Sequence, residues 1–299
     1  MPITFRLKEQ PSVPLEAETL SPDVVAPLAH SDVCALPVYF GKRRRRLDDF
    51  FEIEGAGSDE LEIHGDVSRV KWIGRGMSRG HIKVEGHAGM HLGAYMKGGR
   101  IDVTGNASDW VGGEMSGGLI HVQGNAGGQV GAAYRGSLSG MSDGTILIEG
   151  TAGLEVGMLM KRGLIVVGGR VRDFAGLYMK GGSLFLLGGA TLRTGAWMSR
   201  GTIVSLATLP LLPTFTYSCD YNPGFLSLYA RRLQTLGFAL PHEAGEGVYR
   251  RYTGDTAMPG RGELLLWQAA TPAKRPAARG AKAKAPRKSK PKARSTRRT

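Results

Sequence analysis

Positively charged residues that follow a recurring methionine are the most regular set of side chains that could bind a ligand. The set contains Lys97, Lys161, Arg162, Lys180 and Arg200, with Arg79 as an earlier member and Asp143 as the one opposing acid. Stacked along a fold they would form a positive ridge, which could bind a polyanionic chain. The interpretation that the sequence favours is a solvated turn edge that blocks association between sheet edges, because charge runs usually face solvent.

Other residues that could do chemistry do not form a recognisable catalytic pattern. Five histidines (His64, His81, His87, His91 and His121) lie close together in the sequence, but we expect scattered surface histidines and no metal site. The acids Asp48, Asp49, Glu52 and Glu54 follow a basic run and are predicted to be a charged loop, not a glycosidase pair. No nucleophile elbow, P-loop or zinc-protease motif is present. The sequence therefore predicts no catalytic site in this chain.

Charge and composition restrict the class of partner. The 299 residues carry a net charge of +13, but residues 273–299 hold twelve basic residues and no acid. The rest of the chain is therefore almost neutral, so the charge does not argue for a nucleic-acid partner. The tail, made mainly of Ala, Pro, Lys, Arg and Ser, is predicted to be disordered.

The cysteines, the first residues and the lengths of the apolar stretches predict the cellular compartment. Cys34 and Cys219 are far apart and do not suggest a disulfide framework or a zinc site. The first residues lack the apolar run of a secretory signal, and no stretch is long and apolar enough to span a bilayer. We therefore expect a cytoplasmic protein without a membrane partner.

A 19-residue repeat must position the cationic residues. Methionines recur at 77, 96, 115, 141, 160, 179 and 198, and two columns of glycines repeat the same steps. One interval is seven residues longer, which identifies Tyr134 to Gly140 as an insertion. Each unit contains a short alternating segment that ends in glycine, such as Ile101-Asp102-Val103-Thr104-Gly105, which is typical of a strand with one buried face. The methionines are predicted to fill the core.

Short strands repeated every 19 residues predict an all-β fold built as a glycine-rich solenoid. Left-handed hexapeptide helices run at multiples of six, so a right-handed parallel β-helix fits the period better. The outward column Leu147, Val166, Phe185, Val204 is apolar, whereas its earlier members Lys83, Asp102 and His121 are polar. We therefore expect the C-terminal segment or a partner protein to cover the late coils.

Segments with different patterns flank the repeat and give four predicted parts. Residues 1–50 are expected to be an extended N-terminal arm, and residues 51–206 the β-helix. Residues 207–272 are expected to hold a helix that opens at Asn222-Pro223 and ends at Gly237, followed by a closing strand within 249–267. Residues 273–299 are the basic tail. The run Lys42 to Arg46 could anchor an acidic partner or be a solvated loop.

The segments at both ends of the repeat resemble a known family. Leu36-Pro37-Val38-Tyr39-Phe40-Gly41, followed by Asp48-Asp49-Phe50-Phe51-Glu52-Ile53-Glu54-Gly55, is similar to the start of the C subunit of formylmethanofuran dehydrogenases. The Met-x-x-Gly coils and the closing segment Arg251-Tyr252-Thr253-Gly254-Asp255 with Gly260 to Leu264 are similar as well. The resemblance covers about residues 36–267. The repeat alone also resembles the β-helix domain of the glutamate synthase large subunit.

The resemblance implies a function that the motifs alone do not. In methylotrophic bacteria the related formyltransferase/hydrolase complex transfers formyl from tetrahydromethanopterin to a methanofuran-type carrier and hydrolyses it to formate; the Ala/Arg-rich composition and basic tail favour this branch. Methanogens instead use a molybdenum or tungsten dehydrogenase. In either branch the resemblance implies a non-catalytic scaffold that binds no cofactor directly. Its partners would be the hydrolase-like A and B subunits and the formyltransferase D subunit. The carrier's polyglutamyl chain would be a ligand for Lys97, Lys161, Arg162, Lys180 and Arg200.

Overall fold

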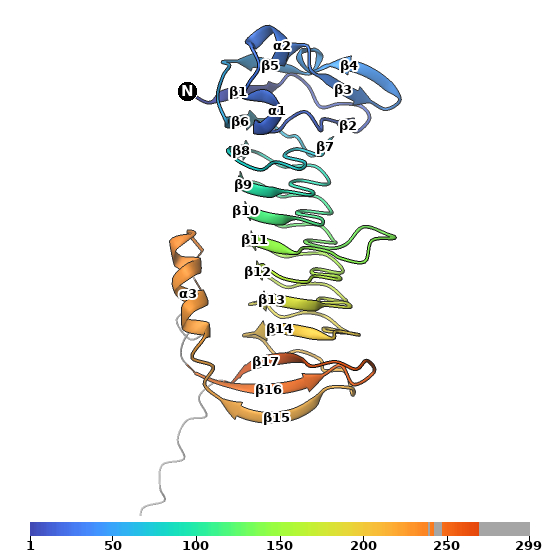
Figure 1. Ribbon diagram of the computed structural model, residues 1–299, viewed down its shortest axis with the longest axis vertical. Helices are drawn as coiled ribbons and strands as arrows, with labels where there is room; N and C mark the ends of the chain where they lie inside the picture. The colour runs from blue at the N-terminus through green and yellow to red at the C-terminus, as the bar shows by residue number, and fades with distance from the viewer. Residues whose placement is uncertain (239, 242–246, 269–299) are drawn as a thin grey trace, which may run out of the picture. The chain divides into compact units, whose positions relative to one another are not determined.

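The computed structural model describes residues 1–238, 240–241 and 247–268, and these residues form a mostly β structure (Figure 1). The predicted basic tail at 273–299 lies outside the described residues. One large sheet has 13 strands in the order β15-β16-β17-β14-β13-β12-β11-β10-β9-β8-β6-β1-β5, and a second sheet has the order β4-β3-β2-β7. Within the described part of the chain, no helix has the length and apolar character that crossing a bilayer requires.

Parallel strands spaced one repeat apart form the centre of the large sheet. These are β6 (Glu60–His64), β8 (His81–Glu85), β9 (Lys97–Val103), β10 (Ser116–Val122), β11 (Asp143–Ile148), β12 (Leu164–Val167), β13 (Lys180–Leu186) and β14 (Arg200–Ser205). Equivalent repeat residues are direct neighbours, so Ile101 pairs with Ile120, and Ile120 with Ile146. The strands predicted from the alternating segments are therefore confirmed.

A second line of parallel contacts joins each repeat to the next. Single bridges link Val67 to Ala88, Ala88 to Ala107 and Ala107 to Ala126. After the insertion, bridges link Ala152 to Val171 and Val171 to Ala190. Each repeat therefore pairs with its neighbour twice, once along the strand and once at the bridge formed by this small residue.

The recurring methionines lie in the core, as predicted. All seven have no exposed surface: Met77, Met96, Met115, Met141, Met160, Met179 and Met198. The inward strand residues, such as Ile120 and Val122, are equally buried. Unbranched thioether side chains fill the irregular space between the strand and the opposite turn.

The segment expected to be an extended N-terminal arm supplies strands to both sheets. In the large sheet, β1 (Ile3–Leu7) lies between β6 and β5 (Phe51–Glu54). The second sheet contains β2 (Leu15–Glu16), β3 (Pro37–Phe40), β4 (Arg43–Arg46) and β7 (Val70–Lys71). Short helices α1 (Pro22–Val25), α2 (His30–Cys34) and η1 (Leu47–Asp49) connect these strands. Ile3 and Phe5 are fully buried, so this segment belongs to the core.

The C-terminal segment adds three strands and one longer helix. These are β15 (Thr216–Tyr221), α3 (Leu226–Thr235), β16 (Val248–Gly254) and β17 (Gly262–Gln268). The predicted closing strand is the antiparallel pair β16 and β17, and β17 continues the parallel register beyond β14. The helix begins after the predicted Asn222-Pro223, because Pro223 to Leu226 form a turn first. It ends before Gly237, whose φ of +84° suits glycine.

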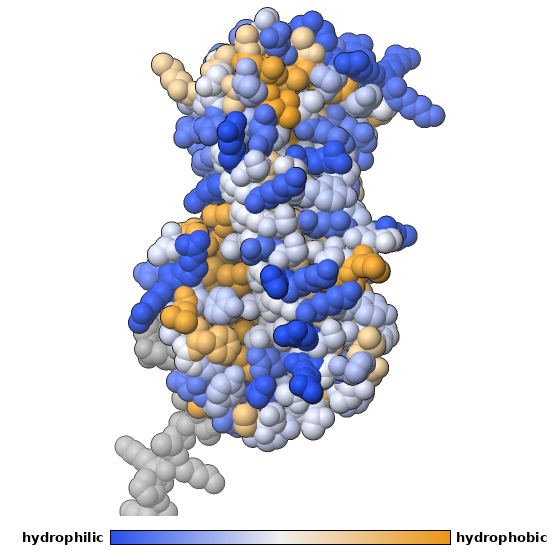
Figure 2. Space-filling view, in the orientation of Figure 1, coloured by the Kyte–Doolittle hydropathy of each residue, from blue (hydrophilic) through white to orange (hydrophobic). Residues whose placement is uncertain are grey.

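Helix α3 covers the apolar outward face of the late strands, as expected from the column pattern. Leu147, Val166, Phe185 and Val204 form a second buried cluster, separate from the main core. Leu226 and Leu233 of α3 belong to the same cluster, together with Phe238, Tyr249 and Leu265. Figure 2 shows apolar surface beside this helix, at the left of the view. The cover comes from this chain itself.

Candidate functional site

The predicted cationic residues lie at one edge of the strand ladder, but not in an unbroken line. Lys97, Lys180 and Arg200 begin strands β9, β13 and β14, and Lys161 and Arg162 come just before β12. All five are exposed. The two repeats between Lys97 and Lys161 have a serine at this position, Ser116 and Ser142. Each serine donates its backbone N–H to the methionine carbonyl of the preceding repeat, as Lys97 and Lys161 do. Lys97 therefore stands apart, and the other four residues occupy three successive repeats.

These four residues keep their charges free of acidic partners. Within the described residues none of them forms an ion pair, and Lys180 Nζ donates to the carbonyl oxygen of Leu138 at 2.8 Å. Lys180 and Arg200 are direct neighbours in the register of β13 and β14. Four cations in adjacent repeats can attract an extended anion, because repeats stacked about 4.8 Å apart keep the charges close together.

A second group of charged residues, which the sequence analysis did not identify, surrounds Asp102 on the outward face of β8 to β11. Asp102 accepts hydrogen bonds from His81 Nε2 at 2.6 Å and from Arg100 Nη2 at 2.8 Å. His121 Nε2 lies 2.9 Å from Glu149 Oε1, and its Nδ1 lies 3.8 Å from Asp102. The register explains the contacts, since Asp102 is the direct neighbour of His121.

Hydrogen bonds determine the protonation state of Asp102. Burial by itself raises the pKa of Asp102, but hydrogen bonds from Arg100 and His81 outweigh burial and lower the pKa below its usual value. Asp102 is therefore held as a carboxylate that already has partners. Among the residues that the structure describes, no group of three or more His, Cys, Asp or Glu could hold a metal ion. The cluster links neighbouring strands through paired acids and bases.

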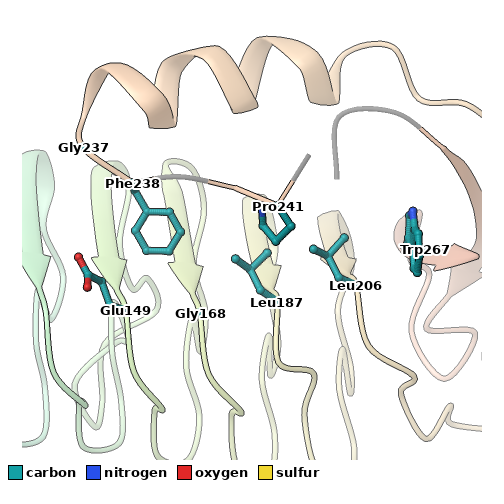
Figure 3. Close-up of a pocket in the computed structure, with 8 residues that line it drawn as sticks. All are labelled: Glu149, Gly168, Leu187, Leu206, Gly237, Phe238, Pro241 and Trp267. Atoms are coloured by element: carbon teal, nitrogen blue, oxygen red, sulfur yellow. The ribbon is translucent and has the colours of Figure 1, made fainter. Parts of the chain in front are cut away.

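An apolar pocket of about 750 Å³ lies where the C-terminal segment passes over the late strands (Figure 3). Its walls are Leu187, Leu206 and Trp267 on the strand side and Phe238 and Pro241 on the other. Glu149 lies at one end, where its carboxylate is already paired with His121. Among the described residues that line the pocket, Glu149 is the one charged side chain.

Aromatic residues gather where the insertion leaves the repeat. Tyr134 stacks on Trp110 with ring centroids 4.5 Å apart, and its hydroxyl lies 2.9 Å from His91 Nδ1. His91 stacks on Trp72 at 4.0 Å. Burial, followed by the nearby Lys71, lowers the pKa of His91 to about 4. The ring is therefore neutral at pH 7, and the aromatic cluster fixes the base of the insertion.

The sequence analysis listed the five cationic residues Lys97, Lys161, Arg162, Lys180 and Arg200, which we call the cationic edge. It identified neither the charged cluster around Asp102 nor the aromatic cluster around Tyr134. Lys83, Asp102 and His121 occupy the same outward position in successive repeats. The position two residues earlier in the strand holds His81 and Arg100, so comparing the two positions would have predicted ion pairs on this face. Nothing in the repeat predicts the contact of Tyr134 with His91, because the insertion has no equivalent in other repeats.

Known proteins share both the repeat and most of the chain. The GXGXG motif family model matches residues 62–209. The C subunit of the molybdenum-containing formylmethanofuran dehydrogenase 1 of Methanothermobacter marburgensis is 47% identical over 83 residues, which are 27% of this chain and 21% of that protein. The C subunit of the tungsten-containing enzyme from the same organism is 39% identical over 92 residues, 29% of this chain and 34% of that protein. The chain thus matches only about a fifth to a third of the length of these relatives.

A bacterial relative matches over almost its whole length. The C subunit of the formyltransferase/hydrolase complex of Methylorubrum extorquens is 37% identical over 263 residues, which cover 88% of this chain and 98% of that protein. A chain in the crystal structure of that organism's complex with methylofuran superimposes with a TM-score of 0.82 at 33% identity, covering 89% of this chain and 100% of that one. Similarity over nearly all of both chains shows that this chain belongs to the family of C subunits of formyltransferase/hydrolase complexes.

Proposed function

We propose that the chain is a non-catalytic scaffold subunit of a complex that transfers formyl from tetrahydromethanopterin to a methanofuran-type carrier and hydrolyses it to formate. The observation that supports this role best is the state of the charged cluster. Its acids and bases, among them Asp102, His121 and Glu149, are already paired with one another. Acids and bases that pair with one another across neighbouring strands have a structural use, and the proposal assigns them that use.

The coverage of the relatives favours this branch over the alternatives. The bacterial relative is matched over 98% of its length, whereas the relative from the molybdenum enzyme is matched over 21%. A role as the C subunit of a molybdenum or tungsten formylmethanofuran dehydrogenase is therefore the second candidate. A glutamate-synthase-type domain is the third, supported by the GXGXG repeat alone. The partners we propose are hydrolase-like A and B subunits and a formyltransferase D subunit.

We infer that the fold serving this role is a right-handed parallel β-helix with 19-residue coils. Two observations support the inference: the parallel register of β6 to β14, and the second line of bridges from Val67 to Ala190. On this inference residues 51–206 form the β-helix, and the described residues between 207 and 268 cover and close it; the rest of the predicted part 207–272 lies outside the described residues. A stacked fold of this kind offers long edges for contacts with other subunits.

The cationic edge supports a further proposal about the carrier. Lys161, Arg162, Lys180 and Arg200, with Lys97 at a distance, would bind the polyglutamyl chain of the methanofuran-type carrier by charge attraction. The supporting observation is that no acid of the described residues neutralises the four late cations. Binding of this kind is salt-dependent, because exposed charges are screened.

Purification from the native host tests the scaffold role. We expect a tagged chain to bring down stoichiometric partner subunits and formyl-transfer and hydrolysis activity, while the chain purified alone has no turnover. Recovery of a partner-free monomer from the host, or turnover by the chain alone, would contradict the proposal.

A charge-reversal series tests carrier binding within the purified complex. Arg162→Glu with Arg200→Glu should reduce the carrier that remains bound after a salt wash. The matched control is Arg170→Glu with Arg172→Glu, two exposed arginines elsewhere on the repeats. Equal carrier content in both variants would contradict a role for this edge.

A further inference from the structure

A patch of exposed apolar side chains lies beside the late cations. It consists of Leu138, Tyr178, Trp197 and Met258, whose exposed fractions are 79%, 40%, 41% and 37%. Tyr178 and Trp197 stand two residues before Lys180 and Ser199, so the aromatic rings and the cationic edge are adjacent. We call these four residues the apolar edge. Large exposed apolar groups that occur together mark interaction sites more often than single ones do.

The apolar edge is held in place by specific contacts. Tyr178 and Trp197 stack with ring centroids 5.2 Å apart and an interplanar angle of 14°. The insertion that carries Leu138 is bound at two points, through Gly140 N to Leu159 O at 3.0 Å and through Lys180 Nζ to Leu138 O at 2.8 Å. These bonds place Leu138 over the repeats that contain Leu159 and Lys180. Less conformational entropy is lost when such an ordered group binds a partner.

The last member, Met258, lies in a turn that is fastened to the same repeat as Trp197. The Trp197 N–H donates to Asp255 Oδ2 at 2.9 Å, and Arg261 N donates to Ser199 O at 2.8 Å. The turn between Asp255 and Arg261 therefore continues the apolar edge beyond the last repeat. The patch extends from the insertion to the closing hairpin.

The charges around the apolar edge are mostly positive. Arg135, Lys161, Arg162, Arg200 and Arg261 are exposed and form no ion pair within the described residues. Of the nearby acids, Asp255 is buried and already accepts hydrogen bonds from the N–H groups of Trp197 and Ala257. Glu114 accepts from Tyr134 N at 2.8 Å, at the start of the insertion, and the Asp143 Oδ1 accepts from Gly144 N. The apolar edge thus has a strongly positive rim.

We propose that the apolar edge is the surface by which this chain docks onto an acidic partner protein of its complex, one that offers an apolar recess rimmed by Asp and Glu. Aromatic, methionine and arginine side chains are the types enriched in interfaces, and Tyr, Trp and Arg carry most of the binding energy. A second copy of this chain does not fit, because a symmetric contact would bring two positive rims together. The inference rests on the proposed function, and it names the partner surface which that function requires.

Substitutions in the apolar edge test the docking surface in the complex purified from its host. Leu138→Asp and Trp197→Ala should each weaken retention of the partner subunits by about tenfold or more, the effect of losing an interface hot spot. The matched control is Leu192→Asp, because Leu192 is 48% exposed and lies on another corner of the repeats. Full retention of partners by Leu138→Asp and Trp197→Ala would overturn the proposal, provided that wild type retains them. If wild type also lacks partners, the proposed function fails and not this inference alone.

Zero-length cross-linking identifies the chemistry of the occupant. A carbodiimide joins an amine to a carboxylate only when the two groups are in contact. Lys161 and Lys180 are the exposed amines beside the apolar edge, and Lys180 already donates to Leu138 O. We expect peptides that join Lys161 to Asp or Glu of a partner protein. Links from Lys161 to a second copy of this chain would overturn the docking proposal, as would links to partner proteins from lysines away from the apolar edge with none from Lys161 or Lys180.

Discussion

The ammonium group of Lys180 donates a hydrogen bond of 2.8 Å to the backbone carbonyl oxygen of Leu138. The two residues are 42 positions apart, and the bond fastens the tip of the only interruption of the period to a later repeat. A second bond, from Gly140 N to Leu159 O, fastens the end of the same insertion. The insertion is therefore an ordered part of the surface, and one of the predicted cations has a structural task as well as a charge.

Lys180→Met should loosen the insertion without unfolding the protein. The methionine keeps the length of the side chain but cannot donate, so a hydrogen bond worth about 1 kcal/mol is lost. Because proteolysis follows the population of the open loop, cleavage by trypsin after the exposed Arg135 should become about fivefold faster. Lys161→Met is the control, since Lys161 makes no bond to the insertion. Equal cleavage rates in the two variants would show that the bond does not hold the loop.

Two glycines with the same backbone conformation should respond very differently to alanine. Gly118 and Gly136 have φ values of +90° and +89°. A Cβ at Gly136 would have no neighbour within 4 Å, so Gly136→Ala should cost only the left-handed strain of about 1 kcal/mol. A Cβ at Gly118 would lie 2.6 Å from Met96 Cε and 2.9 Å from the Gly99 carbonyl oxygen. Because the Gly99 backbone cannot move aside, Gly118→Ala should cost about 3 kcal/mol or more.

Urea unfolding of both glycine variants measures the difference directly. The loss of unfolded-state entropy on replacing glycine by alanine is the same for both, so it cancels in the comparison. Similar unfolding midpoints for Gly118→Ala and Gly136→Ala would mean that adjacent repeats are not packed as closely as the structure has them.

The pH dependence of stability should reflect His91. Its pKa is lowered to about 4 in the folded protein, mainly by burial, from about 6.5 in the unfolded chain. Between these values the unfolded state binds the proton and the folded state does not, so stability is full above pH 6.5 and falls as the pH drops towards 4. His91→Gln removes the titrating ring, and Gln129 occupies the equivalent position in a later repeat with a φ of +56°. Between pH 7 and pH 4.5 the melting temperature of the variant should therefore fall by less than that of the wild type. An unchanged pH profile would mean that His91 stays solvated.

The repeat made the centre of the fold predictable, and it did so through spacing alone. A methionine every 19 residues has to occupy the same place in each repeat, and Met160 and Met179 are fully buried as that argument requires. The same reasoning predicted a cover for Phe185 and Val204, because outward apolar side chains on stacked strands form one continuous face.

Contacts that break the period could not be predicted in this way. Tyr134 reaches His91, 43 residues earlier, from an insertion that occurs once. The position of β1 between β6 and β5 is a second such contact. The sequence shows apolar Ile3 and Phe5 in alternation, and the structure buries both. Alternation identifies a strand with one buried face, but it does not say which edge the strand joins. The gap between Lys97 and the later cations, in contrast, could be read from the period, because Ser116 and Ser142 directly follow the repeat methionines Met115 and Met141.

Substitutions on the two sides of α3 should separate the second core from the surface of the helix. Leu233 is fully buried against the late strands, whereas Leu228, on the same helix, is 65% exposed. Leu233→Ala should cost about 2–5 kcal/mol because it leaves a cavity beneath the helix, and Leu228→Ala should stay within about 0.5 kcal/mol. The change in helix propensity is identical in the two variants, so the difference reports burial alone. Chemical unfolding followed by circular dichroism gives both values, and hydrogen exchange of the α3 amides shows whether the helix leaves the strands first. A Leu233→Ala variant as stable as Leu228→Ala would mean that the late apolar face is covered by something other than α3.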